Sequence, residues 1–132
     1  MCRILVADDD VRQLELRGLL LEAGGHEVSL AFCPSEALRQ LTVAEVVIMD
    51  LRFPNAQGDP DPAEGLKLIR QIRESGCRAP VIVISGWPQD LEGTPEARLV
   101  ARVMAKPVGS EALLAAIGES LSGASAPVRN PL

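Results

Sequence analysis

Polar residues that could form one chemical site follow directly after four short apolar runs of the sequence. Residues 3–7 precede two aspartates, residues 46–49 a third, residues 81–84 a serine and residues 102–105 a lysine, which are in order Asp8, Asp9, Asp50, Ser85 and Lys106. Three carboxylates brought together repel one another, which disfavours their ionised forms unless a cation joins them. Carboxylate oxygens suit Mg²⁺, which takes one or two carboxylates and keeps several waters. These residue types therefore predict a magnesium site, provided that the fold brings them together.

The charges of such a site would favour an anion as its substrate. Three aspartates, one Mg²⁺ and one lysine sum to a formal charge of zero, so an added anion meets no net repulsion. A phosphoryl group is the obvious candidate, because Mg²⁺ and lysine commonly hold it. A carboxylate can take that group as a nucleophile. A lysine and a small hydroxyl can then hold its oxygens through charge-assisted hydrogen bonds.

The elements that would have to position these residues alternate along the chain. Apolar segments predict buried strands at residues 3–7, 28–31, 46–49, 81–84 and 102–105. Helices are predicted from Asp10 to Gly24-Gly25, from Pro34, from Pro95 with Thr94 as its cap, and over residues 110–121. Another helix is predicted after residue 63, with Leu66, Ile69 and Ile72 inward, and Gly76 ends it. A loop rich in Pro, Asp and Gly is predicted over residues 51–63. Strands alternating with helices indicate a parallel sheet with right-handed crossovers, whose ligands bind at the carboxyl ends of its strands.

The composition excludes several other classes of protein. The chain has 132 residues and a net charge of −5, which suits one domain and disfavours nonspecific binding to nucleic acid or anionic lipid. Two Phe and one Trp are too few for base stacking, so no direct nucleic-acid partner is expected. One histidine excludes a histidine-based metal cluster, and three cysteines without metal-type spacing fit a reduced, cytoplasmic setting. The apolar runs are too short to span a bilayer or to form a secretory signal, so no membrane insertion is expected.

Four short motifs, in order and near their usual spacing, resemble those of a known family. They are Asp8-Asp9 after an apolar strand, Met49-Asp50 with Pro54 four residues on, Ser85-Gly86 after Val-Ile-Val-Ile, and Lys106-Pro107. Together they resemble the receiver domain of two-component response regulators, over residues 2–121. The resemblance implies a doubly wound α/β fold, a flavodoxin-like three-layer sandwich whose five-stranded parallel sheet has the order 2-1-3-4-5. We therefore expect a receiver domain over residues 1–121 and a disordered tail over residues 122–132.

The resemblance also implies a role for each residue of the predicted site. Asp50 would accept the phosphoryl group, while Asp9 would bind Mg²⁺ directly and Asp8 through water. The main-chain carbonyl of Arg52 would be a further metal ligand. Ser85 would bind the phosphoryl group and move on activation, and Lys106 would pair with a phosphoryl oxygen.

Four more residues would form the switch region and its loops, namely Gly86, Trp87, Val103 and Pro107. Pro107 would shape its loop through a cis bond. Trp87 either lies near the mouth of the site or is a partly exposed loop aromatic. The family has an aromatic residue three positions before the lysine, where this chain has Val103, and Gly93 and Pro95 break the fourth helix. The usual coupling of a moving hydroxyl to a turning aromatic ring therefore cannot operate in that form.

Two further departures from the family lie near Asp50. About seven residues look inserted between Pro54 and Glu64-Gly65, and we hypothesise that they modulate access to Asp50 or partner choice; a neutral surface insertion is the alternative. Arg52 occupies a position that in the family faces the phosphoryl group and tunes its lifetime. A long cation there could shield that group or pair with it, so we expect slower loss of phosphate than in Arg52→Asn.

The function implied is that of a stand-alone, single-domain response regulator. It would receive a phosphoryl group on Asp50, with Mg²⁺, from a sensor histidine kinase or a histidine phosphotransfer protein, and would signal through contacts with a downstream protein. Homodimer formation is left open. The chain would catalyse only its own phosphorylation and dephosphorylation, so it is not expected to be a conventional enzyme. The alternatives are a pseudo-receiver that binds partners without phosphate, and an aspartyl-nucleophile phosphatase, which would need a second Asp where this chain has Arg52.

Overall fold

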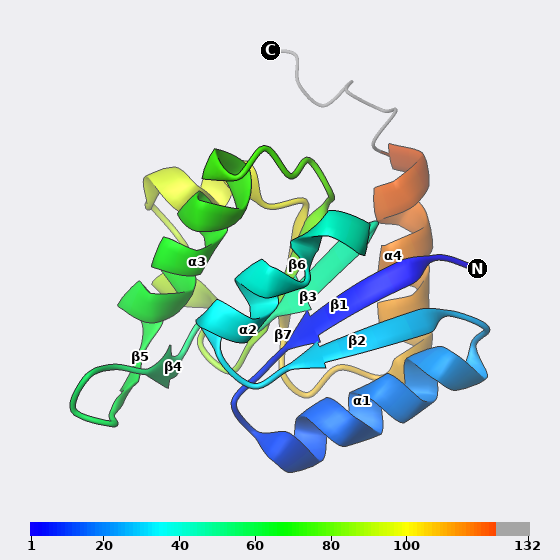
Figure 1. Cartoon of the computed structure of the whole chain (residues 1–132), viewed down its shortest axis with the longest axis horizontal. Coiled ribbons are helices and arrows are strands. Elements are labelled where there is room, and N and C mark those ends of the chain that lie inside the picture. The colour runs from blue at the N-terminus through cyan, green and yellow to red at the C-terminus, as the bar shows by residue number, and fades with distance from the viewer. Residues whose placement is uncertain (124–132) are drawn as a thin grey trace.

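Five apolar segments form a parallel sheet in this computed structural model, which describes residues 1–123 (Figure 1). The strands are β1 (Arg3–Ala7), β2 (Glu27–Ala31), β3 (Val46–Met49), β6 (Val81–Ser85) and β7 (Arg102–Ala105). Their order in the sheet is β2-β1-β3-β6-β7, with every neighbouring pair parallel. This order confirms the predicted 2-1-3-4-5 arrangement. In register, Ala7 pairs with Met49, and Ser85 pairs with Ala105, so the carboxyl ends of these strands meet at one edge.

Helices cover both faces of this sheet (Figure 1). They are α1 (Val11–Ala23), α2 (Pro34–Arg39), α3 (Pro62–Glu74) and α4 (Ser110–Gly123). The carboxylate of Asp10 accepts a hydrogen bond from the N–H of Gln13 and so caps α1. Asp61 caps α3 in the same way through the N–H of Ala63. No helix of residues 1–123 has the length and apolar character needed to cross a membrane.

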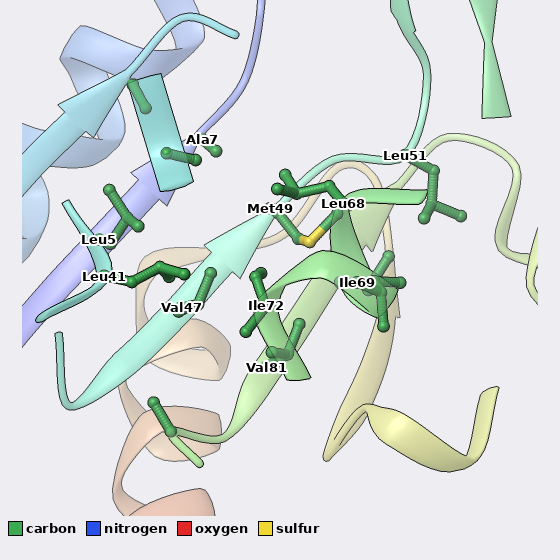
Figure 2. Packing of buried hydrophobic residues seen from close by; sticks show 14 of the residues in the cluster. Leu5, Ala7, Leu41, Val47, Met49, Leu51, Leu68, Ile69, Ile72 and Val81 are labelled. Carbon is green, nitrogen blue, oxygen red and sulfur yellow. The ribbon is translucent and has the colours of Figure 1, made fainter. Parts of the chain in front are cut away.

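Alternate residues of each strand point to opposite faces of the sheet, which gives the domain two cores. One core joins odd-numbered strand positions to α2 and α3 and includes Leu5, Ala37, Val47, Met49, Leu68 and Ile72 (Figure 2). The other joins even-numbered positions to α1 and α4 and includes Ile4, Leu14, Ile48, Ile82, Leu113 and Ile117. Burial on both faces explains why β3 and β6 have continuous apolar sequences.

The segment after β3 is more ordered than the sequence predicted. Residues 51–63 were expected to be a loop, but they contain a small antiparallel hairpin of β4 (Phe53–Pro54) and β5 (Pro60–Asp61), and α3 already begins at Pro62. Each strand has two residues, too few for any periodic pattern. The Asn55 side chain organises the turn, because its Oδ1 accepts hydrogen bonds from the N–H groups of Gln57 and Asp59.

The predicted inner face of α3 is confirmed. Ile69 and Ile72 are fully buried, and Leu66 is partly buried and packs against the same core. Leu68, which was not predicted, is fully buried on this face as well.

No continuous helix connects β6 to β7 in the described part of the chain, as Gly93 and Pro95 predicted. Two short 3₁₀ helices, η2 (Pro88–Asp90) and η3 (Pro95–Leu99), take its place, and a third, η1 (Leu41–Val43), follows α2. Thr94 precedes η3 but does not cap it, because its hydroxyl donates to the carbonyl of Leu91. Arg73 ties η3 to α3 by donating two hydrogen bonds to the carbonyl of Leu99.

The last helix continues past the domain boundary that the sequence placed at residue 121. It extends to Gly123, so Ser122 belongs to α4. The predicted disordered tail otherwise falls on residues 124–132, which lie outside the described residues.

Candidate functional site

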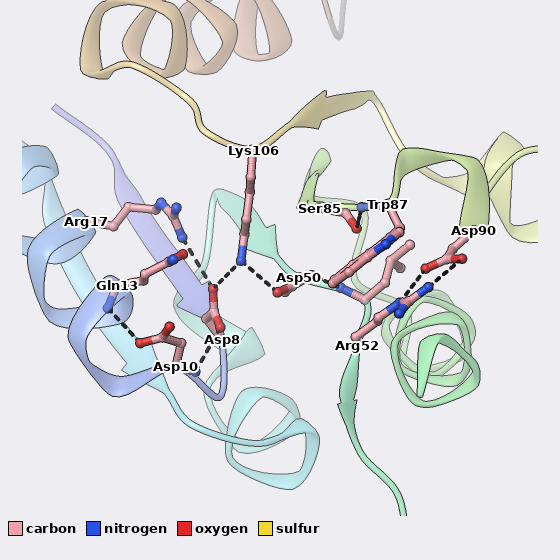
Figure 3. A network of polar contacts seen from close by, with 11 residues as sticks. Asp8, Asp10, Gln13, Arg17, Asp50, Arg52, Ser85, Trp87, Asp90 and Lys106 are labelled. Carbon is pink, nitrogen blue, oxygen red and sulfur yellow. Dashed lines mark hydrogen bonds and ion pairs between the residues drawn. The ribbon is translucent and has the colours of Figure 1, made fainter. Parts of the chain in front are cut away.

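The carboxyl edge of the sheet brings together the three aspartates and the lysine that the sequence singled out. One carboxylate oxygen from each of Asp8, Asp9 and Asp50 lies within 4.8 Å of the others. The Nζ atom of Lys106 lies 2.9 Å from Oδ2 of Asp50 and 3.4 Å from Oδ2 of Asp8 (Figure 3). The chain thus places one cation between the carboxylates of two residues that directly follow β1 and β3.

Main-chain hydrogen bonds fix the orientation of two of these carboxylates. Oδ1 of Asp8 accepts from the N–H of Asp10 at 2.9 Å, and Oδ1 of Asp50 accepts from the N–H of Leu51 at 2.7 Å. The N–H of Asp50 in turn donates to the carbonyl of Ala7, which extends the β1–β3 pairing by one residue. The second oxygen of each carboxylate faces Lys106 (Figure 3).

The carboxylates of this cluster lie close enough to repel one another, and Asp9 is affected both by this repulsion and by burial. Partial burial and the charge of Asp8 raise the pKa of Asp9 above its ordinary value. Partial burial disfavours the charged form of Lys106, but the hydrogen bond to Asp50 and the charges of Asp8 and Asp50 outweigh it and raise the pKa of Lys106. Lys106 is therefore a fixed cation at neutral pH.

Arg17 also contacts the cluster and was not predicted from the sequence. Its Nη1 lies 3.5 Å from Oδ2 of Asp8, a carboxylate that is almost fully buried. The signal was present, because Arg17 lies on the same stripe of α1 as the buried residues Leu14 and Gly18. A cation on the inner face of a helix needs a buried partner, and Asp8 provides it.

Ser85 lies at the predicted place but its hydroxyl already has a main-chain contact. The side chain is fully buried, and its Oγ accepts a hydrogen bond from the N–H of Trp87 at 2.9 Å. The N–H of Lys106 donates to the carbonyl of Ser85 at 2.9 Å, which links the ends of β6 and β7. The Lys106-Pro107 peptide is cis, as the resemblance implied.

The side chain of Arg52 was expected from the sequence to face the reactive group on Asp50, but in the structure it contacts Asp90 instead. Its Nε donates to Oδ2 of Asp90 at 2.8 Å and its Nη2 to Oδ1 at 3.3 Å, and its guanidinium lies 3.8 Å from the centre of the Trp87 ring (Figure 3). The hydrogen bond to Asp90 raises the pKa of Arg52, and the charges of Asp90 and Asp50 act in the same direction. No sequence signal marked Asp90, because the path of residues 86–94 has no regular period.

The remaining switch positions lie on the surface beside the site. Trp87 is 48% exposed and Val103 is 38% exposed, and Gly86 is exposed as well. Trp87 combines the two readings left open by the sequence, because it is a partly exposed loop aromatic that also contacts a residue two positions from Asp50.

The loop after Asp50 is held by an unusually close helix. A Cβ atom on Gly65 would lie 2.4 Å from both Cα and O of Leu51. Only glycine allows α3 to approach the main chain of Leu51, the residue after Asp50, this closely.

The sheet order and the acidic cluster beside a lysine define a receiver-like α/β domain. The chain belongs to the response regulator receiver domain family, whose sequence model matches residues 4–118. It is 30% identical over 132 residues to a protein named transcriptional regulatory protein CpxR homolog, from Haemophilus influenzae. This alignment covers 98% of the present chain and 55% of that relative. The chain spans about half the length of the curated relatives it matches.

Solved structures show the same fold. A response regulator receiver domain protein from Clostridium thermocellum matches with a TM-score of 0.80 at 26% identity, over 95% of this chain and 98% of that one. The response regulator TrrA from Thermotoga maritima, crystallised in complex with Mg²⁺-BeF, matches with a TM-score of 0.77 at 23% identity, over 91% of this chain and 99% of that one.

Proposed function

We propose that Asp50 accepts a phosphoryl group from a phosphohistidine of a histidine kinase or a histidine phosphotransfer protein. The observation that carries this proposal is the 2.9 Å contact of Lys106 with Asp50 inside a cluster of three carboxylates. An Oδ atom of Asp50 would attack phosphorus, so that a P–O bond forms and the P–N bond breaks. The electron pair of that bond returns to the imidazole ring of the donor.

The residues present fit a Mg²⁺ ion. Asp8, Asp9 and Asp50 offer hard oxygen ligands, and burial together with the charge of Asp8 raises the pKa of Asp9. A divalent cation bound among these carboxylates would relieve their repulsion. Asp9 and Asp50, with the main-chain carbonyl of Arg52, would hold the ion, and Asp8 would act through water. When bound, Mg²⁺ neutralises charge on the phosphoryl oxygens. TrrA, a protein of the same fold, binds Mg²⁺ with a phosphoryl analogue, which supports the same assignment for this chain.

Two side chains of this protein would bind the oxygens of the transferred phosphoryl group. Lys106 would pair with one phosphoryl oxygen, and the hydroxyl of Ser85 would donate to another after leaving the N–H of Trp87. We propose that the domain catalyses only the gain and loss of its own phosphoryl group, and that it then signals through contacts with a target protein. Arg52, at the position where an aspartyl phosphatase would need its acid, argues against phosphatase chemistry.

Intact mass tests this proposal directly. The protein is incubated with Mg²⁺ and a small acyl phosphate, beside an Asp50→Asn control and a sample with EDTA. We expect the gain of one phosphoryl group in the parent protein alone. A folded protein that gains none contradicts the proposal and favours a phosphate-independent binding module, a reading that Val103 at the usual aromatic position also supports.

A further inference from the structure

Trp87 and Asp90 together form a small site shaped for a guanidinium group. The ring of Trp87 provides a flat face at 3.8 Å, and Asp90 provides both carboxylate oxygens to one fork of nitrogen donors. Stacking on an aromatic ring combined with a two-pronged carboxylate contact is the geometry that selects arginine over lysine. The occupant of this site in the structure is the chain's own Arg52.

The occupant is held by contacts that are open to competition. Trp87 is half exposed, and the side chains of Arg52 and Asp90 are 28% and 14% exposed. Ion pairs that water can reach are weak individually. The charge of Asp50 also attracts Arg52 from the other side, because the two residues are separated by a single residue.

Phosphorylation would change that competition by adding charge on one side only. The three aspartates, one Mg²⁺, Lys106 and Arg17 sum to a formal charge of +1 before phosphorylation. A phosphoryl group replaces one carboxylate charge by a charge of about −2, so the cluster gains roughly one negative charge, placed at Asp50. Lys106 and Arg17 are already paired with Asp8 and Asp50, whereas Arg52 pairs with a carboxylate outside the cluster. Arg52 is therefore placed to respond to the new charge.

We propose that Trp87 and Asp90 form an arginine-binding site that Arg52 blocks in the resting protein and vacates when Asp50 is phosphorylated. The ligand would be an exposed arginine of a target protein. The release step depends on the proposed phosphoacceptor function, whereas the arginine site itself does not. The hydrogen bond from the N–H of Trp87 to Ser85 gives a second link, because Ser85 would give up that bond to hold the phosphoryl group.

The sequence makes this site unusually easy to observe. Trp87 is the one tryptophan of the chain and there is no tyrosine, so the intrinsic emission comes from the proposed site alone. The probe is N-acetylarginine amide, and its neutral citrulline counterpart is the control ligand. Arg52→Gln opens the site without phosphorylation, and Asp90→Asn removes the carboxylate. Arg102→Gln is the matched control variant, because Arg102 pairs with Glu119 at the outer edge of the sheet.

The first arm tests the site in unphosphorylated protein. From the change in Trp87 emission, we expect Arg52→Gln to bind the arginine probe with a dissociation constant at least about fivefold lower than that of the parent protein. The citrulline compound should not change the emission. Adding Asp90→Asn to Arg52→Gln should abolish the response, and Arg102→Gln should behave as the parent does. Equal responses of Arg52→Gln and the parent would overturn the arginine site.

The second arm tests release by phosphorylation, with the modification verified by intact mass. Phosphorylated parent protein should bind the arginine probe as tightly as Arg52→Gln does. A mass gain without tighter binding overturns the switch and leaves the phosphoacceptor function intact. No mass gain overturns the phosphoacceptor function and the switch with it, while the first arm still decides the arginine site.

Discussion

Lys106 and Asp50 lie 56 residues apart in the sequence, yet Nζ and Oδ2 of the two side chains meet at 2.9 Å. The same ammonium group lies 3.4 Å from Oδ2 of Asp8, so one lysine balances part of the charge of two aspartates that follow different strands. This contact stabilises the resting cluster and also marks the place where a phosphoryl oxygen would replace the carboxylate oxygen as the partner of Lys106.

Lys106→Gln should separate metal binding from phosphorylation. Removing the cation leaves the carboxylates more negative, so Mg²⁺ should bind severalfold more tightly. Phosphorylation by a small acyl phosphate should slow by roughly tenfold to a hundredfold, because a donor to the phosphoryl oxygens is lost. Mg²⁺ titration and timed intact mass measure the two effects. Lys67→Gln, on the exposed face of α3, is the control, and a parallel fall in both quantities would contradict the assigned role.

Asp9→Asn should raise stability and remove the response to Mg²⁺. Burial and the charge of Asp8 raise the pKa of Asp9, so the fold favours its ionised form less than the unfolded chain does, and a neutral side chain removes this cost. We expect a melting temperature a few degrees higher without Mg²⁺ and no further rise when Mg²⁺ is added, since ligand stabilisation requires binding. Asp10→Asn is the matched control, because asparagine caps α1 equally well. An Asp9→Asn protein that Mg²⁺ still stabilises would show that Asp9 is not a ligand.

Gly65→Ala should disrupt the loop beside Asp50. A Cβ atom there would lie 2.4 Å from main-chain atoms of Leu51, so α3 or the loop must move. We expect the free energy of unfolding to fall by about 2–3 kcal/mol, with slower phosphorylation of Asp50. Gly118→Ala, in α4 with open space around it, should instead be stabilising by about 0.5–1 kcal/mol. Equal effects of the two changes in urea denaturation would contradict the close approach.

The Arg70–Glu96 ion pair between α3 and η3 should give a pH-dependent contribution to stability. The hydrogen bond from Arg70 lowers the pKa of Glu96. Glu96 therefore stabilises the fold above its unfolded-state pKa of about 4.3, and this contribution is lost as the pH falls through the lower folded-state pKa. Glu96→Gln should lower the free energy of unfolding by about 1 kcal/mol at neutral pH.

The difference between Glu96→Gln and the parent protein should shrink as the solution is acidified below about pH 4. Urea denaturation of both proteins at neutral and acid pH measures it. A difference that persists undiminished in acid would show that the pair is not the cause.

The β4–β5 hairpin should affect protein donors more than small ones. Deleting residues 56–58 leaves Asn55 and Asp59 as a two-residue turn and keeps the Asp61 cap of α3. We expect unchanged phosphorylation by a small acyl phosphate and severalfold slower transfer from a phosphohistidine protein. Identical rates with both donors would mean that the insertion is neutral.

The site residues that could be predicted from the sequence are those that directly follow a strand. Asp8, Asp50 and Lys106 each follow an apolar run, and a parallel sheet necessarily brings such positions to one edge. Asp90 could not be predicted, because its contact with Arg52 depends on the path of a loop with no regular period. The hairpin was missed for a related reason, since its two-residue strands carry no alternation and are rich in proline, which normally argues against a strand.

The contact between Lys106 and Asp8 spans 98 residues of the chain. During synthesis, the three aspartates leave the ribosome long before the lysine that balances them. A nascent chain that ends before β7 therefore carries an acidic cluster in which Asp50 has no lysine partner, and the sheet lacks its last strand. Competence to receive a phosphoryl group would then arise late in synthesis, once β7 has docked, so that partly made chains do not compete with finished ones for the donor.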